Sequence, residues 1–312
     1  MPSPPAGVGA YVPSYMYPAY KTADFSSIFS GTLRVFFRHP AEFILPYLAL
    51  SLGTTLLVYV LLFGTAAGSL FGLDPTASPA AVFAALNALL LVLIVFVLVS
   101  LVLSTLVQGA VSHYAVLRHR AAAVSFTFSF RHAWTRFPVL LGAILLYAGV
   151  LFGVLAIALV PLFAGLSTLN LALLGLGILA LIPAAIVALY VALALSLVVP
   201  AIMMEDVGVL ASFRRSWQMT KGHRLSIFGT FFVLGLISGA ITVAVAFAFG
   251  ALVDPVVSLL VQLVVSGALT SWNIIAPAVA YDLIAREPRY APFWGWPGPP
   301  AAAPPTSPPA PP

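Results

Sequence analysis

Six long apolar stretches constrain the fold of this chain more than any other feature. They cover roughly residues 43–64, 80–112, 139–164, 168–199, 225–252 and 256–281. A helix needs about 20 apolar residues to cross the hydrocarbon core of a bilayer. The sequence therefore predicts an all-α integral membrane protein with six transmembrane helices.

Composition excludes several other classes of protein. The chain is 62% hydrophobic and 7% charged, whereas soluble domains are about half apolar and about a quarter charged. The net charge is +5, but the basic residues lack the polar surroundings that a soluble nucleic-acid-binding groove needs. We therefore expect no nucleic-acid partner. Cysteine is absent, which excludes disulfides, thiolate chemistry and Cys-ligated metal sites.

Three regions follow from the composition along the chain. Residues 1–22 form a Pro- and Tyr-rich segment that we expect to be flexible, and residues 23–286 form the six-helix membrane domain. Residues 287–312 are dominated by proline and predict a disordered cytoplasmic tail with polyproline II character. Such a tail is a candidate docking segment for a protein partner. The sequence does not indicate an oligomeric state.

The charges indicate an orientation. With six spans, all 13 lysines and arginines fall on the side of the termini and of the loops after spans 2 and 4. The opposite loops carry Asp74 and Asp254 instead. Cytoplasmic loops are enriched in Lys and Arg. We therefore expect a multi-pass protein of the cell (cytoplasmic) membrane with both termini in the cytoplasm.

A short motif recurs before the first, third and fifth spans. The segments "LRVFFR" (33–38), "FRHAWTR" (130–136) and "FRRSWQM" (213–219) each place an aromatic residue three positions after an arginine. A second motif ends the hairpins, as "PAIMME" (200–205), "PAVAYD" (277–282) and, more weakly, "GAVSHY" (109–114). The pattern predicts three hairpins, each preceded by a cytoplasmic interfacial amphipathic helix.

The helical spacing of apolar residues supports two of these interfacial helices. One stripe contains Phe25, Phe29, Leu33 and Phe36, and another contains Val209, Phe213 and Trp217. Segment 125–137 begins with alternating phenylalanines, so its first half is less clearly helical. Such helices lie with the apolar face in the lipid and the cations toward the headgroups. The candidate headgroup contacts are Arg34, Phe37, Arg131, Trp134, Arg214, Arg215, Trp217 and Lys221.

Two acids occupy the same position in two copies of the second motif, Glu205 and Asp282. Each could take an arginine from a neighbouring interfacial helix and so fix how the hairpins dock, or each could contact a ligand. With His39, His113, His132 and His223 they could also form a metal or acid–base site. We favour simple pairing with arginines, because no catalytic motif is present. We therefore expect no enzymatic activity, no metal and no cofactor.

Polar residues within the spans have two interpretations. Asn170, Gln262 and Asn273 are candidate intramembrane contacts, which either hydrogen-bond across helices or line a path. No span carries an ionisable residue near its middle, which argues against an ion-coupled pump. Two Gly-x-x-x-Gly pairs, at 149/153 and 235/239, permit close helix packing, which we expect within the core rather than in a dimer.

The stretch from Pro200 to Gly222 resembles the membrane-domain family named after bacterial glycerophosphoryl diester phosphodiesterases. The resemblance is carried by Pro200, Glu205, Gly208, Arg215-Ser216-Trp217, Thr220-Lys221-Gly222 and the later Tyr281-Asp282-Leu283. In those phosphodiesterases catalysis belongs to a separate soluble barrel with metal-binding acids, and that barrel is absent from this sequence. The resemblance thus implies a membrane fold without enzymatic activity.

Three hypotheses about function remain open at this point. The leading one is a non-enzymatic protein that interacts with membrane lipids or scaffolds a membrane complex. The second is a transporter or channel for a small molecule or lipid, in which Asn170, Gln262 or Asn273 would line a cavity between the hairpins. The third is a membrane-embedded enzyme of lipid metabolism that uses Glu205, Asp282 and a histidine.

Overall fold

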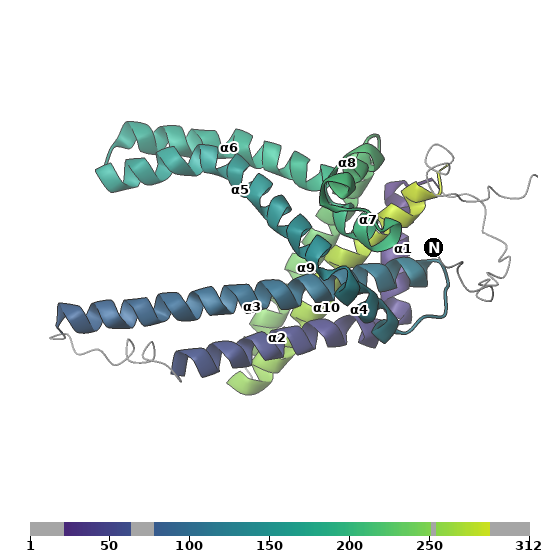
Figure 1. Cartoon of the computed structure of the whole chain (residues 1–312), viewed down its shortest axis with the longest axis horizontal. Coiled ribbons are helices and arrows are strands. Elements are labelled where there is room, and N and C mark those ends of the chain that lie inside the picture. The colour runs from purple at the N-terminus through teal and green to yellow at the C-terminus, as the bar shows by residue number, and fades with distance from the viewer. Residues whose placement is uncertain (1–21, 64–77, 251–253, 288–312) are drawn as a thin grey trace, which may run out of the picture.

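The computed structural model describes residues 22–63, 78–250 and 254–287, which are helical almost throughout (Figure 1). The predicted flexible segment before residue 22, the loop with Asp74 and the predicted tail from 288 onward lie outside the described residues. Within the described part there are ten α-helices and no strand: α1 Phe25–Arg38, α2 Pro40–Phe63, α3 Pro79–His119, α4 Phe126–Thr135, α5 Phe137–Thr168, α6 Leu171–Ala194, α7 Val198–Glu205, α8 Val209–Thr220, α9 Arg224–Gly250 and α10 Pro255–Ala285.

Six helical stretches are long and apolar enough to cross a membrane, which confirms the multi-pass prediction. They correspond to α2, α3, α5, α6 together with α7, α9 and α10. Two predicted boundaries were wrong. The second span continues as one helix to His119, and the fourth apolar run is interrupted after Ala194.

Side-chain caps explain where several helices begin. Ser78 accepts the amide of Ala81 at 3.3 Å in front of Pro79, as the sequence suggests. Ser125 accepts the amide of Phe128 at 3.3 Å and starts α4. The segment with alternating phenylalanines is therefore a helix, because a capped start and a buried face outweigh a short period-two pattern.

The break after α6 has a physical cause that lies twenty residues further along the chain. Residues 195–197 form a turn, so backbone groups of the apolar run lose their helical partners. Ser216 of α8 donates to the carbonyl of Ala194 at 2.8 Å and accepts the amide of Leu197 at 3.2 Å. Thr220 donates to the same carbonyl at 3.2 Å. These bonds give the free backbone groups the hydrogen-bond partners that the hydrocarbon of a bilayer cannot provide.

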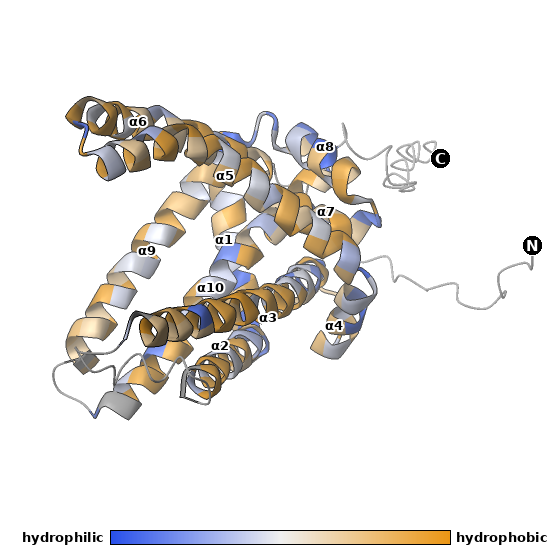
Figure 2. Cartoon of the chain, turned by 60° about the vertical axis from the view of Figure 1, so that its left-hand side comes forward, coloured by the Kyte–Doolittle hydropathy of each residue, from blue (hydrophilic) through white to orange (hydrophobic). Residues whose placement is uncertain are grey.

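The short helices α1, α4, α7 and α8 gather at one end of the molecule, together with the C-terminal ends of α3 and α10 (Figure 1). We call this region the polar end. Most of the hydrophilic residues lie on the short helices and adjoining turns, whereas the long helices are mostly hydrophobic (Figure 2). The largest buried cluster lies at the polar end and includes Ile28, Phe43, Tyr114 and Tyr281. The fold is therefore held together mainly where the chain is most polar.

Away from the polar end, the long helices expose large apolar side chains. Phe152 and Ile157 on α5 are 67% and 74% exposed. A soluble monomer rarely leaves such a surface uncovered. Large apolar side chains exposed over the rest of the long helices are what a lipid environment accommodates.

Close helix packing occurs at other glycines than the sequence predicts. A Cβ atom at Gly177 would lie 2.5 Å from the backbone nitrogen of Leu162, and one at Gly165 would lie 2.5 Å from that of Leu174. These two glycines let α5 and α6 pack along each other. A Cβ atom at any of the four glycines of the two Gly-x-x-x-Gly pairs would meet open space, so the prediction that they pack within the chain was wrong.

Each interfacial-motif helix packs on a copy of the second sequence motif. Helix α4 packs on the end of α3, α8 packs on α7, and α1 packs on α10. In the last case Phe36 meets Trp272 edge to face, with ring centroids 5.6 Å apart. The first helix of the described chain thus rests on the last one, and the three contacts follow one another around the polar end.

Candidate functional site

The arginine and the aromatic residue of the repeated motif are exposed in all three copies. Arg34, Arg131 and Arg214 are exposed, and their aromatic partners Phe37, Trp134 and Trp217 are 66%, 62% and 42% exposed. We call these six residues the arginine–aromatic rim. No ion pair of the three arginines occurs within the described residues. Lys221, the further candidate contact, is also exposed.

The structure adds a position that the sequence analysis missed. The residue two places before each rim arginine is a small hydroxyl side chain, Thr32, Ser129 or Ser212, and all three are fully buried. Thr32 and Ser212 donate to backbone carbonyls of their own helices, at 2.8 and 2.6 Å. Ser129 bonds His113 of α3 at 3.0 Å. A small buried hydroxyl lets each short helix approach the surface beneath it closely, which is how the rim is held outward.

The packing faces of these helices differ from the predicted apolar stripes. On α1 the buried side chains are Ile28, Thr32, Val35 and Phe36, while Phe25 is exposed. On α8 the buried set is Ser212, Arg215, Ser216, Met219 and Thr220. Val209 and Phe213 are half-buried at the edge of that face. The predicted stripes were expected to face lipid, and that stays a prediction. Neighbouring helices cover a different set of residues, of which only Phe36 belongs to a stripe.

Arg215 is not a headgroup contact, contrary to the sequence prediction. Its side chain is 9% exposed and its Nε donates to Glu205 at 3.0 Å. The hydroxyl of Tyr281 donates to the same carboxylate oxygen at 2.9 Å. Glu205 thus joins α7, α8 and α10. Glu205 pairs with an arginine of α8, one of the predicted interfacial helices, as expected.

Asp282 has different partners from those expected. Its side chain is fully buried and accepts from Nδ1 of His119 and Nε of Arg120, both at 2.6 Å, and from Arg286 one turn along α10. The first two donors come from the end of α3 and not from α1. The prediction of an arginine from an interfacial helix was wrong here, because α1 presents apolar and small side chains to α10. His119 was also missing from the predicted histidines.

The other predicted histidines are spread over the polar end. His113 and His132 stack with ring centroids 4.6 Å apart, and Nε2 of His132 lies 3.1 Å from the carbonyl of Met203. His39 lies 3.8 Å from Glu42, which also meets Arg118 at 3.4 Å. Within residues 22–63, 78–250 and 254–287, no three His, Asp or Glu side chains are arranged to hold a metal ion.

Two further side-chain pairs lie at the polar end, and one of them involves the last described residue, Glu287. Arg136 pairs with Asp206, and His223 pairs with Glu287 at 2.7 Å. Glu287 is 5% exposed. The predicted disordered tail therefore begins one residue too early, because Glu287 is packed and paired.

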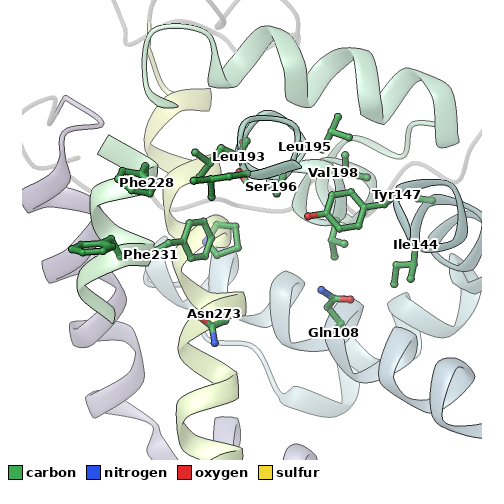
Figure 3. Close-up of a pocket in the computed structure, with 16 residues that line it drawn as sticks. Gln108, Ile144, Tyr147, Leu193, Leu195, Ser196, Val198, Phe228, Phe231 and Asn273 are labelled. Carbon is green, nitrogen blue, oxygen red and sulfur yellow. Dashed lines mark hydrogen bonds between the residues drawn. The ribbon is translucent and has the colours of Figure 1, made fainter. Parts of the chain in front are cut away.

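A cavity of about 640 Å³ lies between the α5–α6 pair and the rest of the domain. Most of its lining is apolar, from α3, α5, α6, α7, α9 and α10. Figure 3 shows Gln108 and Tyr147 turned toward the cavity from α3 and α5, with Asn273 on α10 below Phe231. Ser196, in the turn after α6, completes the polar lining.

A smaller cavity of about 320 Å³ lies between α9 and α10 and shares Asn273 with the larger one. Its polar lining includes Gln262, Thr242, Ser266 and Thr270. Two of the three predicted amides therefore face cavities. Asn170 does not, because it caps α6 in the turn after α5 and accepts the amides of Ala172 and Leu173.

Arg224 and its aromatic neighbours are a second feature that the sequence analysis missed. The guanidinium carbon lies 4.4 Å from the ring centroid of Tyr190 on α6 and 4.6 Å from that of Trp217 on α8. Arg224 also donates to the hydroxyl of Tyr190. The sequence shows only an arginine at the start of a span. Its aromatic partners, Tyr190 and Trp217, lie on two other helices, so their contact with Arg224 is visible only in the structure.

Comparison with known proteins gives a family but no activity. No curated protein and no solved structure matches the chain. A family model described as a domain of unknown function, DUF7847, matches residues 26–286, which run from the second residue of α1 to just past the end of α10. The match covers every helix described above, so the chain belongs to the DUF7847 family.

Proposed function

We propose that this protein is a non-enzymatic, multi-pass membrane protein whose polar end binds the headgroups of anionic lipids. The observation that carries the proposal is the arginine–aromatic rim. In each of three helices the same two motif positions stay exposed while the two residues between them are buried or half-buried. Arginine and tryptophan at such sites suit the headgroup level of a bilayer.

The proposal includes an orientation and an arrangement of the spans. Every described lysine and arginine belongs to a short helix, or to the end of a span or a turn at the polar end. Asp254, in the turn before α10, lies at the other end of its span. We place the polar end and both termini in the cytoplasm, with α1, α4 and α8 as interfacial helices before three hairpins. The contacts of α2 with α3, α5 with α6 and α9 with α10 support this arrangement.

The two repeated acids support a structural role rather than a catalytic one. Asp282 is enclosed by two arginines and a histidine, and Glu205 is held between Arg215 and Tyr281. A general acid or base must reach a substrate proton, and both carboxylates already accept donors from their neighbours. The resemblance to the membrane domain of the phosphodiesterases stays a prediction.

The test replaces the three rim arginines together. The variant Arg34→Gln/Arg131→Gln/Arg214→Gln removes charge at exposed positions, and the matched Arg→Lys triple variant keeps it. We expect the Gln variant to retain less phosphatidylglycerol in native mass spectrometry, and the Lys variant to resemble the wild type. At about 1 kcal/mol for each basic residue, the expected loss is on the order of a hundredfold. Equal retention by the wild type and the Gln variant would refute the proposal.

A second candidate function is transport, and one specific observation favours it. Asn273 lines both cavities, so neutral polar side chains extend from Gln262 within the α9–α10 pair toward Gln108 and Ser196. Such a series suits a small neutral solute better than an ion. Glycerol uptake into proteoliposomes tests this function. We expect Asn273→Leu and Gln262→Leu to reduce uptake, and wild-type uptake no faster than that of empty vesicles would exclude the glycerol path.

A further inference from the structure

The larger cavity has a side that faces the bilayer. Leu189 of α6 and Phe232 of α9 line it and are also 47% and 54% exposed. Side chains that line a cavity and are half-exposed mark an opening, here between α6 and α9. Because these two helices contact each other only sparsely, the opening lies on the lipid side of the molecule. We call it the α6–α9 window.

Arg224 and Tyr190 bridge the window on the side toward the polar end. Arg224 is the first residue of α9, one turn before Phe228, which lines the cavity. Tyr190 follows the window residue Leu189 on α6, and Trp217 of α8 also lies against the guanidinium group, with its ring centroid 5.8 Å from that of Tyr190. The three residues thus form a cationic and aromatic border where the apolar opening meets the headgroup level.

The charge of Arg224 has no acidic partner within the described residues. Its contacts there are the Tyr190 hydroxyl and the two aromatic rings, and its Nε is buried without a hydrogen-bond acceptor. The nearby acid Glu287 is paired with the neighbouring His223. Nη1 donates to Tyr190, and the remaining Nη hydrogens of a guanidinium group are suited to a phosphate oxygen.

The interior of the cavity suits a hydrocarbon chain that carries a polar group at one level. Phe228, Phe231, Leu193 and Val199 supply apolar walls. The amide of Gln108 can bind an ester or hydroxyl, and the side-chain oxygens of Asn273 and Ser196 can accept from a hydroxyl while their own donors bond the carbonyls of Leu269 and Leu193. The volume of about 640 Å³ lies within the range of about 300–1,000 Å³ of small-molecule sites.

We propose that the cavity is a binding site for one anionic phospholipid, which inserts an acyl chain through the α6–α9 window and places its phosphate on Arg224. This site deepens the proposed lipid-binding function and is separate from the arginine–aromatic rim in all residues except Trp217. The rim binds headgroups from outside, whereas the cavity encloses a chain. The two can therefore fail independently.

The experiment uses the full chain reconstituted with equal amounts of phosphatidylglycerol and phosphatidylcholine that carry the same acyl chains. Native mass spectrometry at high salt, which weakens rim contacts more than enclosed ones, should show one retained phosphatidylglycerol. Ala192→Phe fills the cavity and should abolish this retention. Ala185→Phe, at an exposed position of the same helix outside the cavity lining, should leave it unchanged. Retention by Ala192→Phe equal to the wild type overturns the site.

Arg224 tests the headgroup part. Arg224→Gln should lower the preference for phosphatidylglycerol over phosphatidylcholine by about fivefold, the effect of roughly 1 kcal/mol from one cation, and Arg224→Lys should preserve it. A wild-type chain without any such preference overturns the assignment of the phosphate to Arg224.

A direct measurement removes the dependence on folding of the variants. A phosphatidylglycerol with a photoreactive acyl chain should label wild-type peptides from both 189–199 and 228–232. Labelling confined to other parts of the chain overturns the cavity site. The rim proposal would then stand or fall on its own triple variant.

Discussion

The hydroxyl of Tyr281 donates to the carboxylate of Glu205 at 2.9 Å, which joins the end of α10 to the end of α7. The two residues lie 76 positions apart in the chain, at neighbouring positions of two copies of the same repeated motif. Arg215 completes the junction from α8. The helix ends are therefore connected to one another through side chains and not only through apolar packing.

Substitutions of Arg214 and of Arg215 should differ in their effect on stability, because Arg214 is exposed and Arg215 is buried. Arg215→Gln leaves Glu205 without its cationic partner at a nearly buried position. We expect the free energy of unfolding in mild detergent to fall by about 3–5 kcal/mol. Arg214→Gln changes an exposed side chain and should cost less than about 0.5 kcal/mol. Similar losses in both variants would mean that the assigned burial of Arg215 is incorrect.

Asp282→Asn should be among the most damaging isosteric changes in the domain. The substitution removes the negative charge on which Arg120, Arg286 and His119 converge. Removing one partner of a buried ion pair costs about 3–5 kcal/mol. Chemical or thermal unfolding of the purified protein measures the effect. Asp254→Asn at the exposed start of α10 is the control, because Asn and Asp are equally good at such a position, and it should change stability little.

Gly177→Ala should separate α5 from α6. The added Cβ atom would lie 2.5 Å from backbone of the facing helix, which cannot move without the helix moving. Overpacking of this kind costs about 1–3 kcal/mol. Gly149→Ala, on α5 in open space, should be neutral or slightly stabilising. Limited proteolysis in the turn around residue 169 reports the opening. A Gly177→Ala protein as resistant as the wild type would contradict the close approach.

Sidedness can be measured because the chain has no cysteine. Ser167→Cys lies at the exposed end of α5, far from the polar end, and Ala123→Cys lies exposed between α3 and α4. We expect an impermeant maleimide to label Ser167→Cys in intact cells, and Ala123→Cys only after permeabilisation. The reverse pattern would place the arginine–aromatic rim outside the cell.

The sequence alone predicted the features that a lipid environment imposes on the chain. Lipid requires long apolar runs, so the spans were recognisable. The arginine and aromatic positions of the repeated motif are exposed on α1, α4 and α8, but the adjacent candidate Arg215 is buried. The partners of Asp282 were not predictable, because His119 and Arg120 lie more than 160 residues away along the chain. Nor was the break at 195–197, since that run contains no charged residue or proline at the break and its turn depends on Ser216 and Thr220.

Asn170 shows how an uninterrupted apolar pattern conceals a turn. The residue lies between two apolar runs and was interpreted as an intramembrane amide. In the structure Leu169 adopts a left-handed backbone with φ of 52°, and Asn170 caps the next helix. Asparagine at such a position is favoured by local hydrogen bonding. The same chemistry suits a cap and a buried contact, so only the geometry distinguishes them.

The contact of α1 with α10 has a consequence for biosynthesis. The ribosome releases α1 first, but the surface on which this helix rests is the last part of the domain to be translated. Until α10 has been inserted, Phe36 lacks its contact with Trp272, and one of the three helix contacts around the polar end is missing. Proteins truncated after α9 should therefore reach the membrane without ever completing their fold.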